Sequence, residues 1–517
     1  MNAGTGRERQ RVVPHRSWIM LALFMAAFLL IRLPPVLHQP AWLDESYFAV
    51  PGWTILQDGV PRIPYMPSRN LEGVFYKADV AMFTLPPAYF YLQAAFYAVF
   101  GPSHGAARLA STAAGLVALW LVFHLGRSFY RDDRIALWAA GLFSLSRFFY
   151  FPCLFARPDM LCGAIGLGAI ACTWSWHRSR RLSSAIAAGG LIGLGMLTHP
   201  FAIVYAMQIG VWVFFGSRGW RQRLRDTGLL VATAFAVFAL WLPLIVAYPE
   251  VFRVQFFNNV LDRSGPGLLE RLVFPWESLK YQSELLLEHA GPWQLALMGL
   301  ALFLVTIHDL RPEVRRAMPG RLTLIVLAWS SIYLLIACQG AHPTKGYWCY
   351  PGAFLFLGVG RAAILIWDRL RNVIPYPRIL AAGGSLILIA IMLPGAGLRA
   401  TAAYVRHWSD PDYNSPRFVQ RILSDLPADA IYLVDPAHVF EVYLSDRETL
   451  AAEMTPFSFD ATGFPYDYLI ASQYDLERNV PEELNATLVR TYGDRSNPFA
   501  CYAELYRAPP VARPSRQ

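Results

Sequence analysis

The chain has 517 residues, of which 55% are hydrophobic and only 16% are charged. Soluble domains carry nearer a quarter of charged residues, so this composition excludes an ordinary soluble protein and indicates a membrane protein. The formal net charge is +9, but the arginines stand between apolar runs instead of covering one soluble face, which argues against a nucleic-acid partner. The six cysteines show no Cys-x-x-Cys spacing, so neither a zinc site nor a redox motif is indicated.

Apolar runs long enough to approach a membrane span recur along most of the chain, since a spanning helix needs about 20 apolar residues. The first follows a basic stretch at 7–16, is too long for a signal-peptide core and lacks a small-residue cleavage site, so we expect it to be retained. The twelve candidate runs are 18–37, 82–101, 107–126, 135–153, 160–176, 183–198, 200–216, 227–248, 292–308, 322–339, 347–366 and 379–398.

The distribution of Lys and Arg predicts the topology, because cytoplasmic loops hold the excess of these residues. An even number of spans must separate two cytoplasmic loops. Downstream of Arg134, two runs separate each neighbouring pair of basic loops, but three runs lie between the N-terminus and the basic loop at Arg127. One run therefore does not cross, and 82–101 is the best candidate because Pro86-Pro87 breaks its first turns. We expect eleven spans, with 82–101 as an amphipathic or re-entrant helix on the outer face. In the alternative, it spans and the charge rule fails once.

The predicted fold is an all-α polytopic membrane protein with a small C-terminal soluble α/β domain. We expect a cytoplasmic N-terminus at 1–17, a transmembrane domain at 18–398 and an extracytoplasmic domain at 399–517, where short β-like runs replace the long apolar ones. An outer loop at 38–106 carries the membrane-associated helix. The expected location is the bilayer of a bacterial inner (plasma) membrane.

Ionisable residues at the predicted outer ends of spans are the candidates for a functional site, since such residues are costly beside apolar sequence. Each has a plainer alternative, as interfacial charge, a structural ion pair, the cap of a tight turn or a lysine that extends from a span end. The candidates are Asp44 and Glu45 after the first run, Arg157 and Asp159 between two runs, His199 before Pro200, and His342, Lys345 and Tyr347 in one turn.

The mixture of carboxylates, cations and imidazoles indicates a chemistry. A carboxylate can act as general base on an acceptor hydroxyl or amine, while cationic groups hold a phosphate and stabilise its departure. Both kinds on one outer surface suit an enzyme that attacks a phosphate-bearing lipid with a nucleophile. Arg69 and Lys77 of the outer loop are further phosphate-binding candidates.

Four stretches in this order resemble motifs of the GT-C superfamily of membrane glycosyltransferases, in the branch of the protein O-mannosyltransferases and the lipid A aminoarabinose transferases. The stretches are Trp42-Leu43-Asp44-Glu45-Ser46-Tyr47, Leu85-Pro86-Pro87-Ala88-Tyr89 with Ala107-Arg108-Leu109-Ala110-Ser111, Phe155-Ala156-Arg157-Pro158-Asp159-Met160-Leu161, and Gly195-Met196-Leu197-Thr198-His199-Pro200. The turn at Lys345 and Tyr347 is a weaker fifth.

The resemblance implies an inverting hexosyl- or pentosyltransferase that uses a polyisoprenyl-phosphate sugar donor at the outer membrane face. The acceptor would be an extracytoplasmic lipid, glycan or protein. Asp44 would be the catalytic base with Glu45 beside it, and Asp159 the second acidic residue. No Asp-x-Asp pattern occurs near Asp159, so we expect no required cofactor and no required divalent metal.

Three positions depart from the pattern that the resemblance implies. Aminoarabinose transferases usually have a lysine where this chain has Leu85, a lysine where it has His199 and an arginine where it has Tyr47. The expected substrate-binding residues are therefore Tyr47, Arg69, Lys77, Arg157, His199, His342, Lys345 and Tyr347. The alternative class is a polytopic transporter or a flippase for lipid-linked sugars, although no internal repeat is visible. A third possibility is a non-catalytic assembly or sensor protein.

Overall fold

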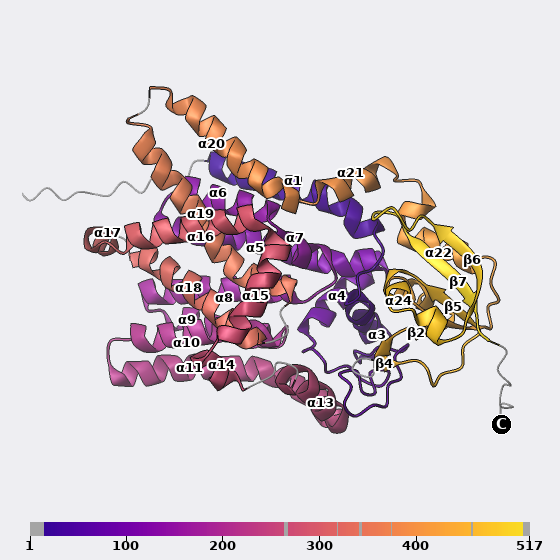
Figure 1. Ribbon diagram of the computed structural model, residues 1–517. Helices are drawn as coiled ribbons and strands as arrows, with labels where there is room; N and C mark the ends of the chain where they lie inside the picture. The colour runs from indigo at the N-terminus through magenta and orange to yellow at the C-terminus, as the bar shows by residue number, and fades with distance from the viewer. Residues whose placement is uncertain are drawn as a thin grey trace, which may run out of the picture.

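A computed structural model describes residues 15–262, 267–317, 319–340, 344–373, 375–455 and 459–509. Helices form one body and the C-terminal strands gather at one end of it (Figure 1). This arrangement agrees with the predicted combination of a polytopic helical part and a small C-terminal α/β part.

Within the described residues, seven helices are long and apolar enough to cross a membrane, or eight if one bent pair counts as a single span. The bent pair is α6 (Asp133–Leu145) and α7 (Arg147–Leu154), which meet at an angle of 60°. The seven are α1 (His15–His38), α5 (His104–Tyr130), α11 (Trp220–Phe238) continued by η2 (Ala239–Trp241) and α12 (Leu242–Ala247), α16 (Pro292–Asp309), α18 (Pro319–Gln339), η4 (Lys345–Trp348) with α19 (Cys349–Leu370), and α20 (Pro377–Met392) with η5 (Leu393–Gly395).

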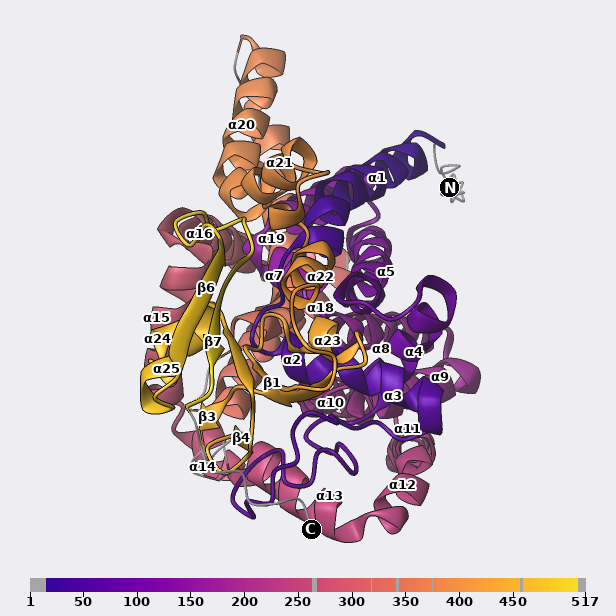
Figure 2. The ribbon, with the colours of Figure 1, turned by 90° about the vertical axis from the view of Figure 1, so that its right-hand side faces the viewer.

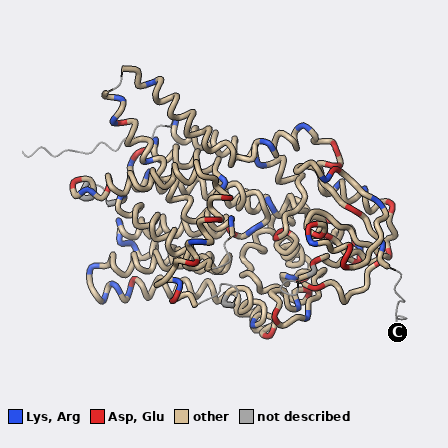
Figure 3. Tube along the Cα trace, viewed as in Figure 1, with Lys and Arg blue, Asp and Glu red and all other residues tan. Residues whose placement is uncertain are grey.

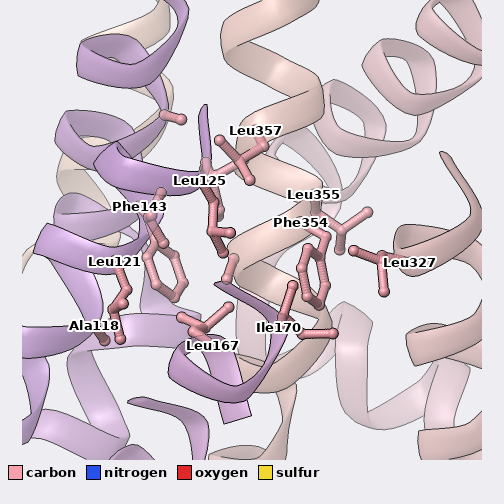
Figure 4. Close-up of a cluster of buried hydrophobic side chains, with 14 of the residues drawn as sticks. Ala118, Leu121, Leu125, Phe143, Leu167, Ile170, Leu327, Phe354, Leu355 and Leu357 are labelled. Atoms are coloured by element: carbon pink, nitrogen blue, oxygen red, sulfur yellow. The ribbon is translucent and has the colours of Figure 1, made fainter. Parts of the chain in front are cut away.

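Three further apolar helices pack among these, namely α8 (Asp159–Ser179), α9 (Leu182–Met196) and α10 (Ile203–Gly216), the last preceded by η1 (Pro200–Ala202). Small residues permit close approach, because a Cβ on Gly193 would come within 2.9 Å of the Cβ of Val237 on α11. Figure 4 shows part of this body's core, where Leu125 of α5, Leu167 of α8 and Leu357 of α19 belong to one cluster of buried side chains.

Residues 38–106, called the outer-loop segment after their expected position, contain three short helices. These are α2 (Glu45–Phe48), α3 (Val50–Asp58) and α4 (Ala88–Phe100), with turns and irregular chain at 59–87. Helix α4 begins directly after Pro86-Pro87 and has 13 residues. At about 1.5 Å per residue it extends for about 20 Å, which is shorter than the roughly 30 Å of a bilayer's hydrocarbon core. It packs instead on α3, where Gly52 lies against Gln93.

Smaller helices connect the long ones. They are α13 (Pro249–Phe256), η3 (Phe257–Asp262), α14 (Leu268–Val273), α15 (Trp276–Ala290) and α17 (Pro312–Ala317). The C-terminal part adds α21 (Leu398–Arg406), η6 (Pro411–Tyr413), α22 (Ser415–Leu423), α23 (Val439–Tyr443), α24 (Gln473–Glu477) and α25 (Val480–Glu483).

The C-terminal strands form a mixed five-stranded sheet in the order β2-β1-β5-β7-β6. Two of the short β-like runs expected in 399–517 become neighbouring parallel strands, with Leu433 opposite Leu469. The sheet strands are β1 (Ile431–Val434), β2 (Glu448–Ala451), β5 (Tyr468–Ala471), β6 (Thr487–Gly493) and β7 (Tyr502–Arg507). Strands β3 (Met454–Thr455) and β4 (Phe459–Asp460) form a separate antiparallel pair.

The C-terminal part packs directly on the outer-loop segment, and Figure 2 looks onto this side of the molecule. The backbone N–H of Ala451 donates to the carbonyl of Tyr65 at 3.0 Å. His104, at the start of α5, pairs through Nδ1 with Oε1 of Glu441 on α23 at 2.6 Å, and both side chains are buried. The two segments share one hydrophobic cluster, so the C-terminal part is fixed against the segment at 38–106.

Candidate active site

A cavity of about 370 Å³ lies where helix ends, the outer-loop segment and the C-terminal part meet. Chain segments far apart in sequence contribute its polar lining. From the residues named in the sequence analysis it contains Asp44, Tyr47, Arg157, Asp159, His199 and Tyr347, and from the C-terminal part it contains Glu453, Thr455 and Arg478. Six of the eleven residues predicted for the site therefore line one cavity.

Arg157 joins the two predicted catalytic aspartates. It lies in the short loop between α7 and α8, where its Nε donates to Oδ2 of Asp159 at 2.8 Å and its Nη1 forms an ion pair with Asp44. The Arg157 side chain is 3% exposed and that of Asp159 is not exposed, whereas Asp44 is 27% exposed. Burial lowers the pKa of Arg157, but the charge and hydrogen bond of Asp159 together with the nearby tyrosines raise it by more, so that the net pKa is raised. Asp44 is therefore the more accessible of the two aspartates, and Arg157 holds it.

Asp159 occupies the first turn of α8, where the helix dipole favours a negative charge. Gly346 of η4 lies directly against its carboxylate, and a Cβ at that position would overlap Oδ2. The second oxygen, Oδ1, is buried without a hydrogen-bond partner among the described residues. The absence of a side chain at Gly346 therefore permits the packing that fixes Asp159.

His199 caps η1, with its Nδ1 accepting a hydrogen bond from the backbone N–H of Phe201 at 3.1 Å. Its ring lies 4.9 Å from that of Tyr347. Burial lowers the pKa of His199 to about 4, with Asp159 acting to raise it and Arg157 to lower it further. The imidazole is therefore neutral at neutral pH, and because Nδ1 accepts, its proton resides on Nε2. His199 can donate a hydrogen bond into the cavity but supplies no positive charge.

Tyr47 connects the outer-loop segment to the C-terminal part of the lining. Its hydroxyl donates to Oε2 of Glu453, which is 3% exposed. Oε1 of Glu453 lies 3.8 Å from Nη1 of Arg478. Tyr47 belongs to the same turn as Asp44, whose carbonyl accepts its backbone N–H at 3.2 Å. Tyr47 thus links the turn that carries Asp44 to Glu453 of the C-terminal part.

Glu45 is not part of the cavity lining. It is fully buried and forms a two-pronged pair with Arg108 of α5, with both N–O distances at 2.7 Å. It also accepts the backbone N–H groups of Trp42 at 2.9 Å and Ala156 at 2.8 Å. Each carboxylate oxygen is thus occupied by protein donors. Glu45 ties the turn after α1 to the loop that carries Arg157.

The remaining predicted cations do not line the cavity either. Each forms an ion pair at the surface: Arg69 with Asp79 at 2.7 Å, Lys77 with Glu250 at 3.0 Å, and Lys345 with Glu288 at 2.6 Å. His342 lies outside the described residues. Within the part of the chain that is described, no group of three or more His, Cys, Asp or Glu side chains could hold a metal ion. That no metal is required stays a prediction.

Two charged residues of the lining, Glu453 and Arg478, were missed by the sequence analysis. They follow strand β2 and helix α24, in the segment that the sequence shows only as a mixed α/β tail. Nothing in their local pattern distinguishes them from solvated charges. Arg108 belonged to a recognised stretch, but its pairing with Glu45 is visible only in the fold.

Residues 84–246 match the family described as dolichyl-phosphate-mannose-protein mannosyltransferase. An undecaprenyl phosphate-alpha-4-amino-4-deoxy-L-arabinose arabinosyl transferase of Pseudomonas aeruginosa strain UCBPP-PA14 is 26% identical over 230 residues. The aligned region covers 43% of this chain and 39% of that relative, so the chain matches well under half of the relative's length.

Solved structures match nearly the whole chain. ArnT of Cupriavidus metallidurans bound to undecaprenyl phosphate aligns with a TM-score of 0.60 and 15% identity, covering 96% of this chain and 98% of that one. An Archaeoglobus fulgidus oligosaccharyltransferase tethered to an acceptor peptide aligns with a TM-score of 0.57 and 14% identity, covering 95% and 74%. These comparisons confirm the resemblance predicted from the sequence: the chain has the fold of the GT-C superfamily of membrane glycosyltransferases.

Proposed function

We propose that this protein is a glycosyltransferase that moves a sugar from a polyprenyl-phosphate donor to an extracytoplasmic acceptor. The observation that carries the proposal is Asp44, a partly exposed carboxylate in a cavity of about 370 Å³, held by a buried arginine. The match to ArnT bound to undecaprenyl phosphate supports a donor of that class. The sugar phosphate of the donor would lie in this cavity, beside the accessible carboxylate of Asp44.

The chemistry follows from the arrangement. The acceptor hydroxyl or amine gives its proton to the carboxylate of Asp44 as it attacks the anomeric carbon. The bond from that carbon to the phosphate oxygen breaks, and the polyprenyl phosphate leaves with the electron pair, which inverts the configuration. Arg157 and Asp159 keep Asp44 in position, so little reorganisation is needed at the moment of reaction.

Not every predicted site residue takes part in this chemistry. Glu45 acts as a positioning residue, because Arg108 and two backbone amides occupy both of its oxygens. His199 and Tyr347 form the wall beside Arg157, where the neutral imidazole offers a donor without a charge.

The proposed topology has eleven spans. Eight come from the long apolar helices when α6 and α7 count as one, and α8, α9 and α10 add three. Helix α4 is placed on the outer face because three apolar runs precede the basic loop at Arg127; its length does not decide this, since α9 and α10 are nearly as short. Many Lys and Arg positions of the helical body mark helix ends away from the strands (Figure 3), which supports a cytoplasmic N-terminus in a bacterial inner membrane. The C-terminal domain at 399–517 then lies outside, over the cavity.

Reconstituted protein tests the proposal. Vesicles would contain the purified full chain, polyprenyl-phosphate sugars with hexose or aminopentose headgroups, and an extract of envelope lipids and glycans. We expect released polyprenyl phosphate, and we expect Asp44→Asn to lower the rate by about 100- to 10,000-fold, as for a lost general base. Asp58→Asn is the matched control, because Asp58 pairs with Arg62 at the surface of the outer loop. Transbilayer movement of intact donor without release would overturn the proposal in favour of a flippase.

A further inference from the structure

The cavity has a charge imbalance that bears on its ligand. The described residues that line it include three carboxylates, Asp44, Asp159 and Glu453, and two guanidinium groups, Arg157 and Arg478. His199 is neutral. A donor phosphodiester would bring a further negative charge, which a site of low dielectric accepts only beside a cation. Given the proposed function, on which this assignment rests, a residue of the chain must supply that cation.

Arg157 is already committed to other partners. Its Nε and Nη1 pair with Asp159 and Asp44, and its side chain is 3% exposed. The cations expected from the sequence to hold phosphate do not replace it, because Arg69, Lys77 and Lys345 are paired elsewhere.

Arg478 differs from Arg157 in exposure and in pairing. Its side chain is 40% exposed and lines the cavity. Its one ion pair among the described residues is with Glu453, at 3.8 Å, which is longer than a hydrogen bond. A guanidinium carries five N–H donors in a planar fork, so one edge can face Glu453 while another binds phosphate oxygens.

The position of Arg478 relative to Asp44 is also suitable. Glu453 anchors the guanidinium from the side and is itself held by the hydroxyl of Tyr47. Tyr47 lies three residues after Asp44 in the same turn. A phosphate at Arg478 would therefore share the lining of the cavity of about 370 Å³ with the carboxylate that accepts the acceptor's proton.

We propose that Arg478 of the C-terminal domain binds the phosphate of the polyprenyl-phosphate donor and stabilises it as it leaves. Under this assignment the C-terminal domain is part of the active site and not merely a cover. Glu453 is a positioning residue that sets the direction of the guanidinium.

Lipid binding to the full chain in nanodiscs tests this assignment directly. The probes are undecaprenyl phosphate and the uncharged undecaprenol, which share a tail and differ in the phosphate. We expect Arg478→Gln to weaken binding of the phosphate about 10- to 100-fold, as for a lost charge-assisted hydrogen bond, and to leave undecaprenol binding unchanged. The affinity of Arg478→Lys for undecaprenyl phosphate should lie between those of the wild type and Arg478→Gln. Arg490→Gln is the matched control, since Arg490 is an exposed arginine of the same domain paired with Asp425.

The ratio of the two affinities separates the possible results. If Arg478→Gln keeps the wild-type ratio, the assignment is wrong, whether both affinities stay or both fall through a loss of structure. Asp44→Asn should bind undecaprenyl phosphate and fail to transfer sugar. Full transfer by Asp44→Asn would refute the proposed function, whereas the affinity ratio alone decides the role of Arg478.

Discussion

Arg157 and Asp44 form an ion pair that joins the loop before α8 to the turn after α1. The same guanidinium donates to Asp159 at 2.8 Å, so one buried side chain positions a carboxylate on each side of it. The accessible member of the pair, Asp44, owes its orientation to residues more than a hundred positions away in the sequence.

Substitution of Arg157 by lysine should impair transfer although the charge is retained. A lysine has one compact ammonium group and cannot present two fixed donors to two carboxylates. We expect kcat to fall about 10- to 100-fold, the range of one lost hydrogen bond to a charged group. Steady-state kinetics on protein of checked thermal stability would measure this, and an unchanged kcat would show that Asp44 does not depend on Arg157.

Gly346→Ala should reduce activity by displacing Asp159. The added methyl group would overlap the carboxylate oxygen that accepts from Arg157. Gly358 of α19 is the matched control, because a Cβ there meets nothing within 4 Å, and alanine in a helix is tolerated or stabilising by up to about 1 kcal/mol. Transfer rates of the two variants should differ by tenfold or more. Equal rates would mean that the position of Asp159 is unimportant.

Glu45→Gln should act mainly on stability. Removing one partner of a buried ion pair leaves Arg108 with an uncompensated charge, at a cost of about 3–5 kcal/mol. The exposed pair of Arg69 and Asp79 is the comparison, since Asp79→Asn should change stability by less than about 1 kcal/mol. Thermal unfolding would measure both. A Glu45→Gln protein with wild-type stability and no transfer would instead favour a catalytic role for Glu45.

The folded protein should lose stability as the pH falls through the range in which His199 titrates in the unfolded chain. The pKa of His199 is lowered by burial from 6.5 to about 4, so the folded state binds this proton less readily than the unfolded state. The stability that comes from the neutral His199 is present above the unfolded pKa of about 6.5. At pH 5 the free energy of unfolding should be lower by about 2 kcal/mol. Thermal unfolding at pH 7.5 and pH 5 should show a smaller loss for His199→Gln than for the wild type. An equal loss would place the titration elsewhere.

The sequence was sufficient to predict the helical fold and much of the cavity. Asp44, Arg157, Asp159, His199 and Tyr347 each stand at an end of an apolar run, and the bias of Lys and Arg predicts that these ends lie on one side of the membrane. All five line the cavity. The prediction that they share one side therefore required only the topology and no knowledge of packing.

The partners of the charged residues could not be predicted in the same way. Arg69 and Lys77 are paired with Asp79 and Glu250, and Glu45 with Arg108, through contacts that depend on how the outer-loop segment folds. Arg478 reaches the cavity only because the C-terminal sheet docks on that segment. Such long-range pairings leave no periodic signal in the sequence.

A structure of the Asp44→Asn protein with bound undecaprenyl phosphate would show where the donor phosphate binds. We expect the phosphate inside the cavity of about 370 Å³, with its oxygens about 3 Å from the guanidinium of Arg478. A second, apolar groove of about 920 Å³ lies between α16, α19 and α20. A phosphate bound at that groove, with the cavity beside Asp44 unfilled, would show that Asp44 and Arg478 do not form the donor site.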